Sequence, residues 1–127
     1  MGEASLVKGN SKYIAFPWHS TGGGILAVVS RYQAGKIETD FPKIIDFQGQ
    51  VTDFDFCPFK DNILAASSSD NLIRLFQIPE SFTINLSHNQ LELKGHIKKP
   101  ILITFNPVSE NVLASTALDN TVKIWDI

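Results

Sequence analysis

Residues 95–127, GHIKKPILITFNPVSENVLASTALDNTVKIWDI, decide how this chain folds. The stretch carries three short apolar runs separated by turn residues, and these runs are residues 101–105, 111–116 and 121–127. Pro107 ends the first run because proline cannot donate to a strand ladder. Asp119 and Asn120 suit a tight turn before the third run, since both residue types tolerate left-handed backbone geometry. The stretch therefore predicts three antiparallel strands that form one unit of a repeat.

Four polar residues of this unit fit together if the unit is a blade of a WD-type β-propeller. In such a blade, a His on the entering loop, a Ser on the second strand, an Asp in the next turn and a Trp on the third strand hydrogen-bond in a chain, which satisfies the buried ring nitrogens. The residues at these places are His96, Ser115, Asp119 and Trp125. His96 and Asp119 could instead form a catalytic pair or bind a metal. Because the spacing is the one that a repeat requires, we predict the structural role.

An upstream copy of the same unit supports the repeat. Shifting the chain by 49 residues lays residues 46–78 onto residues 95–127 without a gap, with the Asp-Asn turn at Asp70 among the identities. The polar chain is lost in this copy, since Phe47, Ala66 and Phe76 stand where the last copy has its His, Ser and Trp. Only Asp70 of the polar chain remains. We therefore expect the middle blade to be held by packing.

A weaker copy precedes these two and completes the predicted architecture. With the same shift of 49, residues 4–9, 12–16 and 25–29 fall on strands, and residues 41–47 supply an outer fourth strand, as residues 91–94 do for the middle copy. The sequence thus predicts an all-β fold of about three consecutive four-stranded antiparallel blades of the WD40 type, which make an incomplete propeller. We expect one partial propeller over residues 1–127, and its approximate blades are 1–47, 48–96 and 97–127, the last without its outer strand.

Composition limits the classes of function. A net charge of -2 gives no general attraction to nucleic acid or acidic membranes, and one Cys excludes an internal disulfide framework. No apolar run is long enough to span a bilayer, and no secretory leader is present, so a cytoplasmic location is expected. The glycine-rich turn at residues 22–24 lacks the Lys-Ser/Thr and the following helix that a phosphate site needs. The three His fall in different loops, without metal-ligand spacing or a nucleophile elbow, so we predict no enzyme, metal or cofactor.

Surface residues on two faces are candidate contacts for protein partners. The long polar connection of one face contributes Arg31 and Lys36, and Trp18, an expected exposed or half-exposed loop residue beside the glycine-rich turn, is a further candidate. Longer polar connections more often carry function. On the opposite face, Lys98 and Lys99 lie beside Lys94 near the Gly-His corner and form a small basic cluster, for which a solvated corner is the simpler interpretation.

Several motifs of the chain resemble a known family. They are GKI at 35–37, FP at 41–42, VTDFDFCPF at 51–59, IPE at 78–80, NVL at 111–113 and DNTVKIW at 119–125. These motifs are similar to the opening repeats of coronins. The middle corner, which lacks Gly-His, resembles the second propeller of the long coronins that carry two propellers in tandem. The resemblance covers nearly the whole chain.

The resemblance implies about the first three blades of a seven-bladed propeller. Coronins are cytosolic proteins that bind filamentous actin and influence actin turnover, and their tandem members are tied to Golgi-linked membrane traffic. The basic segment that conventional coronins place before the first strand has no counterpart in residues 1–10.

We therefore expect a non-catalytic protein-interaction scaffold, linked to actin cytoskeleton organisation or to Golgi-linked trafficking. The alternative is a general WD-repeat adaptor, for example in a ubiquitin or trafficking complex. The expected partners are proteins, with filamentous actin as a candidate, and neither nucleic acid nor membrane insertion is expected. The chain is expected to be a homo-oligomer that completes its blades with copies of itself, or a fragment of a longer protein. Its expected location is cytoplasmic, with cytoskeletal or Golgi association.

Overall fold

The computed structural model describes residues 7–18, 24–30, 43–80 and 85–127, and this part of the chain is built of strands without helices. The first sheet contains β1 (Lys8–Gly9), β2 (Tyr13–Trp18), β3 (Ile25–Ser30) and β4 (Lys43–Ile44). The middle sheet contains β5 (Val51–Phe56), β6 (Ile63–Ser68), β7 (Ile73–Gln77) and β8 (Leu91–Leu93). The third sheet contains β9 (Pro100–Phe105), β10 (Val112–Ala117) and β11 (Val122–Asp126).

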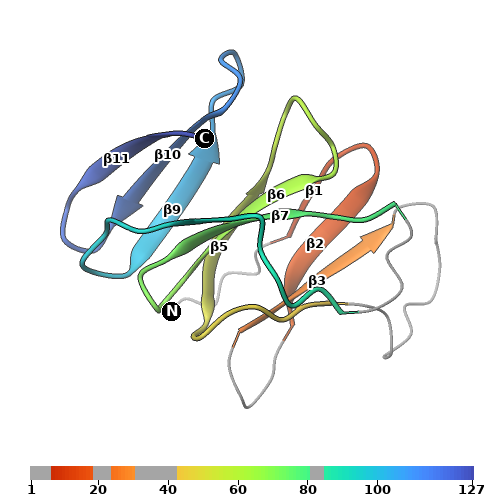
Figure 1. Cartoon of the computed structure of the whole chain (residues 1–127), viewed down its shortest axis with the longest axis horizontal. Coiled ribbons are helices and arrows are strands. Elements are labelled where there is room, and N and C mark those ends of the chain that lie inside the picture. The colour runs from red at the N-terminus through yellow and green to blue at the C-terminus, as the bar shows by residue number, and fades with distance from the viewer. Residues whose placement is uncertain (1–6, 19–23, 31–42, 81–84) are drawn as a thin grey trace.

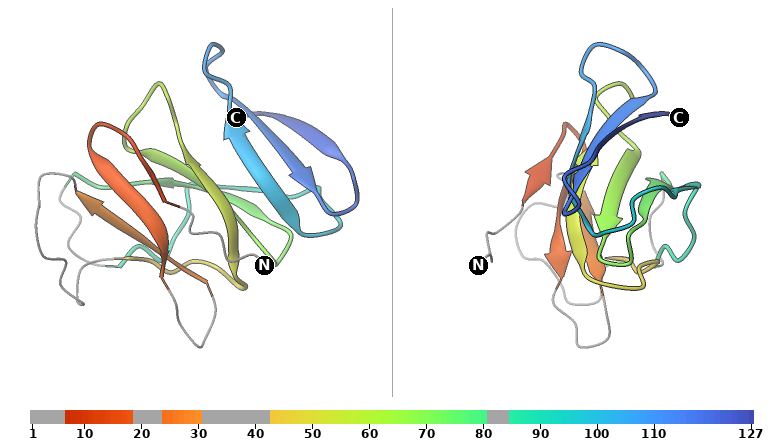
Figure 2. Two further views of the ribbon diagram at one scale, coloured as in Figure 1. Left: turned by 180° about the vertical axis from the view of Figure 1, so that it is seen from behind. Right: turned by 90° about the vertical axis from the view of Figure 1, so that its left-hand side faces the viewer.

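The three sheets are antiparallel and follow one another in chain order. Each sheet is a simple meander in which consecutive strands pair, with four, four and three strands respectively among the described residues. They stand side by side, with the middle sheet between the other two (Figure 1), and the views from behind and from the side agree (Figure 2). The predicted all-β fold of consecutive propeller blades is confirmed.

The turn before the third strand explains the Asp-Asn pair of the repeat. Asn71 and Asn120 adopt left-handed backbone conformations, with φ of 72° and 65°. The Asp of each pair does not adopt the left-handed conformation. Its carboxylate instead accepts a hydrogen bond from a backbone N–H of the turn. Asp70 Oδ1 accepts a hydrogen bond from Leu72 N, and Asp119 Oδ1 accepts one from Thr121 N, each at 3.2 Å.

The uniform shift of 49 residues is wrong in the first blade. In the first blade, Tyr13 and Ala15 of β2 face the middle sheet. In the middle blade, Ile63 and Ala65 of β6 face the third sheet in the same way, so β2 aligns with β6 at a shift of 50 residues. Ile14, which a shift of 49 would place inside, is 38% exposed. The shift changes because residues 19–24 join β2 to β3, a longer connection than residues 69–72 in the middle blade. A slip of one residue moves every side chain of a strand to the other face.

Two apolar clusters hold neighbouring blades together. The first lies between the first and middle sheets, and its largest fully buried members are Phe54, Phe76, Leu26, Ile44, Leu64 and Ile78. The second lies between the middle and third sheets and contains Ile73, Leu75, Ile103, Phe105 and Leu113. Both faces of the middle sheet are therefore covered, which makes it the best buried of the three.

The outer rim of the first blade is covered by a later part of the chain. Leu86, in the connection between β7 and β8, forms a parallel bridge with Ile44. Leu86 N donates to Lys43 O and Ile45 N donates to Leu86 O, both at 2.9 Å. This connection therefore ties the first and middle blades together at their rim.

The third sheet presents an apolar face to solvent. Leu102, Val122 and Ile124 lie on this face and are 60%, 66% and 68% exposed. The corresponding face of the middle sheet, which includes Ile73 and Leu75, is buried against the third sheet. An apolar sheet face of this kind is normally covered by a neighbour.

Candidate functional site

The polar residues of the last repeat form one hydrogen-bonded relay in the third blade. Trp125 Nε1 donates to Ser115 Oγ at 2.8 Å, and Ser115 Oγ lies 2.7 Å from His96 Nε2. On the other side of the ring, His96 Nδ1 lies 3.2 Å from Thr121 Oγ1, which donates to Asp119 Oδ1 at 2.5 Å. Ser115 and His96 are 1% and 6% exposed. The structure thus brings the four predicted residues together through Thr121, which the sequence prediction did not include.

The relay has one consistent direction of donation. Since Thr121 gives its proton to Asp119, its oxygen accepts from His96 Nδ1–H. His96 Nε2 is then an acceptor for the Ser115 hydroxyl, whose oxygen accepts from Trp125. This assignment requires a neutral imidazole with the proton on Nδ1, inferred from the bonding pattern. Burial lowers the pKa of His96 and outweighs the opposing effect of Asp119, while Lys123 lowers it further.

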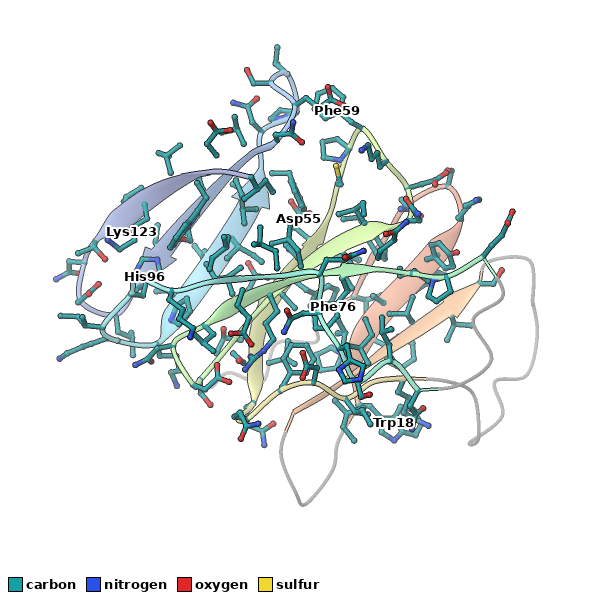
Figure 3. All side chains as sticks on the ribbon, viewed as in Figure 1. Trp18, Asp55, Phe59, Phe76, His96 and Lys123 are labelled. Carbon is teal, nitrogen blue, oxygen red and sulfur yellow. The ribbon has the colours of Figure 1, made fainter. Side chains whose placement is uncertain are left out.

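The Gly-His corner is shaped by the ring of Trp125. The rings of His96 and Trp125 meet edge to face, with centroids 6.1 Å apart and an interplanar angle of 67°. A Cβ atom on Gly95 would lie 3.0 Å from Trp125 Cη2, so a larger residue at this position would push the indole aside. Figure 3 shows His96 beside the third sheet with Lys123 close by.

The middle blade has an apolar version of the same corner. Phe47 and Phe76 also meet edge to face, with centroids 5.5 Å apart and an interplanar angle of 66°. Ala66, at the position of Ser115, is fully buried against them. The two blades therefore share one ring geometry, built from polar residues in one and apolar residues in the other.

The expectation that the middle blade relies on packing alone is wrong. Arg74, which is 2% exposed, donates to Asp70 Oδ2 at 2.7 Å and to Ser68 Oγ at 3.0 Å. Its Nε lies 3.9 Å from Asp46 and 3.7 Å from Glu92, without a hydrogen bond. Burial raises the pKa of Asp70, but the hydrogen bonds from Arg74 and Ser68 outweigh burial and lower it. The middle blade therefore contains an ionic cluster around a buried arginine, which the sequence analysis did not predict.

Two aspartates join the first strands of neighbouring blades, and the prediction missed both. Asp53 Oδ2 accepts from Ile103 N at 2.8 Å, and Asp55 Oδ2 accepts from Phe105 N at 2.9 Å. Lys8 of the first blade reaches Asp53 Oδ1 at 3.1 Å. Burial raises the pKa of Asp55 and outweighs the hydrogen bond from Phe105. A signal was present in the sequence, because carboxylates that alternate with phenylalanine in β5 must share one face of a buried strand.

The proposed partner contacts lie in separate places. Trp18 is half-buried at the end of β2, with Lys43 Nζ 5.3 Å from its ring centroid (Figure 3). Lys98 and Lys99 are exposed beside the Gly-His corner. The two remaining contacts, Arg31 and Lys36, lie outside the described residues, as does most of the glycine-rich turn.

An apolar groove of about 240 Å³ opens at the junction of the middle and third blades. Cys57, Leu75, Phe105 and Ile127 contribute to its wall, and Cys57 packs against the second apolar cluster. Within residues 7–18, 24–30, 43–80 and 85–127, no His, Cys, Asp and Glu side chains gather in a group that could hold a metal ion. The same residues include no helix long and apolar enough to cross a membrane.

Comparison with known proteins connects this architecture to a family. The family model described as "WD domain, G-beta repeat" matches residues 42–77 and 87–126, and one described as "Domain of unknown function (DUF1899)" matches residues 1–36. The chain is 34% identical over 128 residues to "Coronin-like protein crn1" of Schizosaccharomyces pombe and 35% identical over 135 residues to "Coronin-like protein" of Saccharomyces cerevisiae. It is 34% identical over 119 residues to human "Coronin-2A".

The similarity covers nearly all of this chain but a small part of its relatives. The two yeast alignments cover 98% of this chain and 21% of each relative, and the human alignment covers 93% and 23%. A crystal structure of the WD40 domain of Toxoplasma gondii coronin superposes with a TM-score of 0.91 and 32% identity, over 96% of this chain and 32% of that one. The predicted coronin resemblance is confirmed. The chain belongs to the WD-repeat family, and the relatives named above, which match almost its whole length, are coronins or coronin-like proteins.

Proposed function

We propose that the chain is a non-catalytic protein-interaction scaffold, a coronin-like propeller segment that takes part in organising the actin cytoskeleton. The observation that carries this proposal is the similarity to coronins over almost the whole chain, in sequence and in backbone. Coronins are expected to bind filamentous actin, so filamentous actin is the first partner to test. A role in Golgi-linked trafficking and a cytoplasmic location belong to the same proposal.

The hydrogen bonds made by the buried polar side chains support a role without catalysis. Both ring nitrogens of His96 lie within hydrogen-bonding distance of hydroxyl groups, and Thr121 separates the ring from Asp119. The buried carboxylates of Asp53 and Asp55 accept hydrogen bonds from the backbone of the next blade. These groups are committed to holding the blades together, whereas a general base must have a free position facing its substrate.

The exposed face of the third sheet supports assembly as part of the same proposal. Its three most prominent apolar side chains, Leu102, Val122 and Ile124, would be covered if a further sheet packed on them as the third sheet packs on the middle one. Such a sheet could come from a second copy of this chain or from a longer parent protein. Head-to-tail packing of copies closes into a ring when the rotation permits.

The function is tested by two binding experiments on the same preparation. In the first, the chain is sedimented with actin filaments, and in the second it is used to capture partners from a cell lysate. Co-sedimentation that saturates with filament concentration is the expected result. Capture of ubiquitin or trafficking components without binding to filaments would replace the cytoskeletal role by the general adaptor role. Failure to bind in both experiments would contradict the scaffold role itself.

A further inference from the structure

One corner of the third blade combines exposed lysines with exposed apolar side chains. This basic corner consists of Lys94, Ile97, Lys98, Lys99 and Leu118, all of them exposed. Ile97 is 77% exposed and Leu118 is 55% exposed. A hydrogen bond of 3.0 Å from Leu118 N to Lys99 O holds the turn after β10 against the loop before β9. The five side chains therefore emerge from one continuous surface.

The middle blade shows that the exposure of Ile97 and Leu118 is not caused by the uncovered outer face of the third sheet. Gln48 and Ser69 occupy the positions of Ile97 and Leu118 there, and both are exposed although the third blade packs on that sheet. A further blade on the third sheet would therefore leave Ile97 and Leu118 accessible. The middle blade places polar, uncharged residues at these positions, where the third blade places apolar ones. Gly49 and Gln50 stand in for Lys98 and Lys99.

The positive charge of the corner has little compensation nearby. Lys94 Nζ lies 3.9 Å from Glu92 Oε1, a long and exposed pair, and in the described part of the chain neither Lys98 nor Lys99 is within ion-pair distance of a carboxylate. The carboxylate of Asp119 accepts hydrogen bonds from Thr121. The corner is thus a local positive patch on a chain whose net charge is -2. Charge complementarity favours an acidic partner.

We propose that the basic corner is a docking surface for an acidic protein segment in which carboxylates flank an apolar side chain. The lysines would pair with the carboxylates, while Ile97 and Leu118 would cover the apolar side chain. This proposal rests on the proposed scaffold function and names the chemistry of one partner surface.

A protein segment fits the surface better than a lipid bilayer does. The charge is confined to one blade, because Gln48, Gln50, Ser69 and Asn71 on the adjoining corner carry none. Asn71 Nδ2 lies 3.3 Å from Ile97 O, so this corner is directly next to the basic one, and its one carboxylate, Asp70, is paired with Arg74. Recognition of an anionic membrane typically uses clusters of about 4–8 Lys or Arg residues, each contributing a similar increment, whereas this corner has only Lys94, Lys98 and Lys99. A compact patch of lysines around two apolar side chains matches a short segment instead.

The test uses fluorescein-labelled peptides and the full chain. One peptide carries leucine flanked by aspartate and glutamate, a second has serine in place of leucine, and a third has glutamine in place of the acids. Lys98→Gln with Lys99→Gln, and Ile97→Ser with Leu118→Ser, are compared with Lys12→Gln plus Lys60→Gln, a charge-matched control on exposed or half-exposed positions elsewhere. Circular dichroism melts confirm that each variant is folded. Phosphatidylcholine vesicles with and without phosphatidylserine are tested in parallel.

We expect the acidic leucine peptide to bind, and either corner variant to weaken it about five- to tenfold, with the control pair changing it less than about twofold. Equal binding by corner and control variants would overturn the proposal, as would equal binding of the leucine and serine peptides. Corner-dependent binding to phosphatidylserine vesicles without peptide binding would also overturn it, in favour of a membrane. If the corner variants still capture actin filaments or lysate partners as the wild type does, the corner proposal fails and the scaffold stands. A wild-type chain that captures nothing contradicts the scaffold instead.

Discussion

Removing one hydroxyl from the relay is expected to cost more stability than replacing its three central side chains. In Ser115→Ala, both Trp125 Nε1 and His96 Nε2 lose their partner at a site that is 1% exposed. An unsatisfied buried polar group costs about 1–3 kcal/mol. Because the indole is half-buried and partly reached by water, we expect a total loss of about 2–4 kcal/mol in the free energy of unfolding.

The middle blade supplies the compensating variant. His96→Phe with Ser115→Ala and Trp125→Phe copies the arrangement of Phe47, Ala66 and Phe76, which already has the same edge-to-face geometry. Replacing all partners of a buried hydrogen bond by apolar groups of similar shape is nearly neutral, so the triple variant should lose less than about 1.5 kcal/mol. Urea unfolding followed by circular dichroism, at one fixed protein concentration and neutral pH, compares the two, with exposed Ser109→Ala as the control. If the triple variant were less stable than Ser115→Ala, the relay would not be the source of the loss.

Three further predictions follow from the other buried groups. Because burial lowers the pKa of His96 in the folded state, the unfolded state binds more protons, and stability should fall as the pH drops below about 6.5. Thermal melts of the triple variant, which lacks His96, should not show this decline. Asp53→Ala leaves Ile103 N without its acceptor and should lower the free energy of unfolding by about 2–3 kcal/mol, measured by urea unfolding against the half-exposed control Asp61→Ala. Arg74→Met leaves three carboxylates without their shared cation and should lower the free energy of unfolding by about 3–5 kcal/mol at neutral pH, with part of this loss recovered at acidic pH. A loss equal to that of the exposed control Lys60→Met would mean that the ionic cluster contributes nothing to stability.

The repeat itself could be predicted from sequence because strand periodicity and turn chemistry are local. Pro107, the Asp-Asn turns and the spacing between them placed the strands of the middle and third blades with small errors at the ends. The first blade was harder, since its longer connection after Trp18 breaks the uniform shift and reverses the faces of β2. A shift measured on two gapless copies cannot reveal an insertion in a third.

The polar contacts also divide into local ones, which the sequence could predict, and contacts between blades, which it could not. His96, Ser115, Asp119 and Trp125 could be found because they stand within one repeat at the spacing that a WD-type blade requires. Their hydroxyl link at Thr121 could not be separated from other polar turn residues. Contacts between blades are not local. The hydrogen bond from Ile103 to Asp53 joins residues about 50 positions apart, and only the packed sheets show that a carboxylate of one blade caps the edge of the next.

The description of this chain as three blades of an open ring is tested most directly by its mass in solution. Light scattering at several protein concentrations measures that mass, and circular dichroism follows the melt of the same samples. We predict assembly above the single-chain mass, because Leu102, Val122 and Ile124 would otherwise face water on an uncovered sheet. Val122→Lys with Ile124→Lys should shift the mass toward the single chain. A sharp single-chain mass for the wild type at every concentration, with a cooperative melt, would contradict the description.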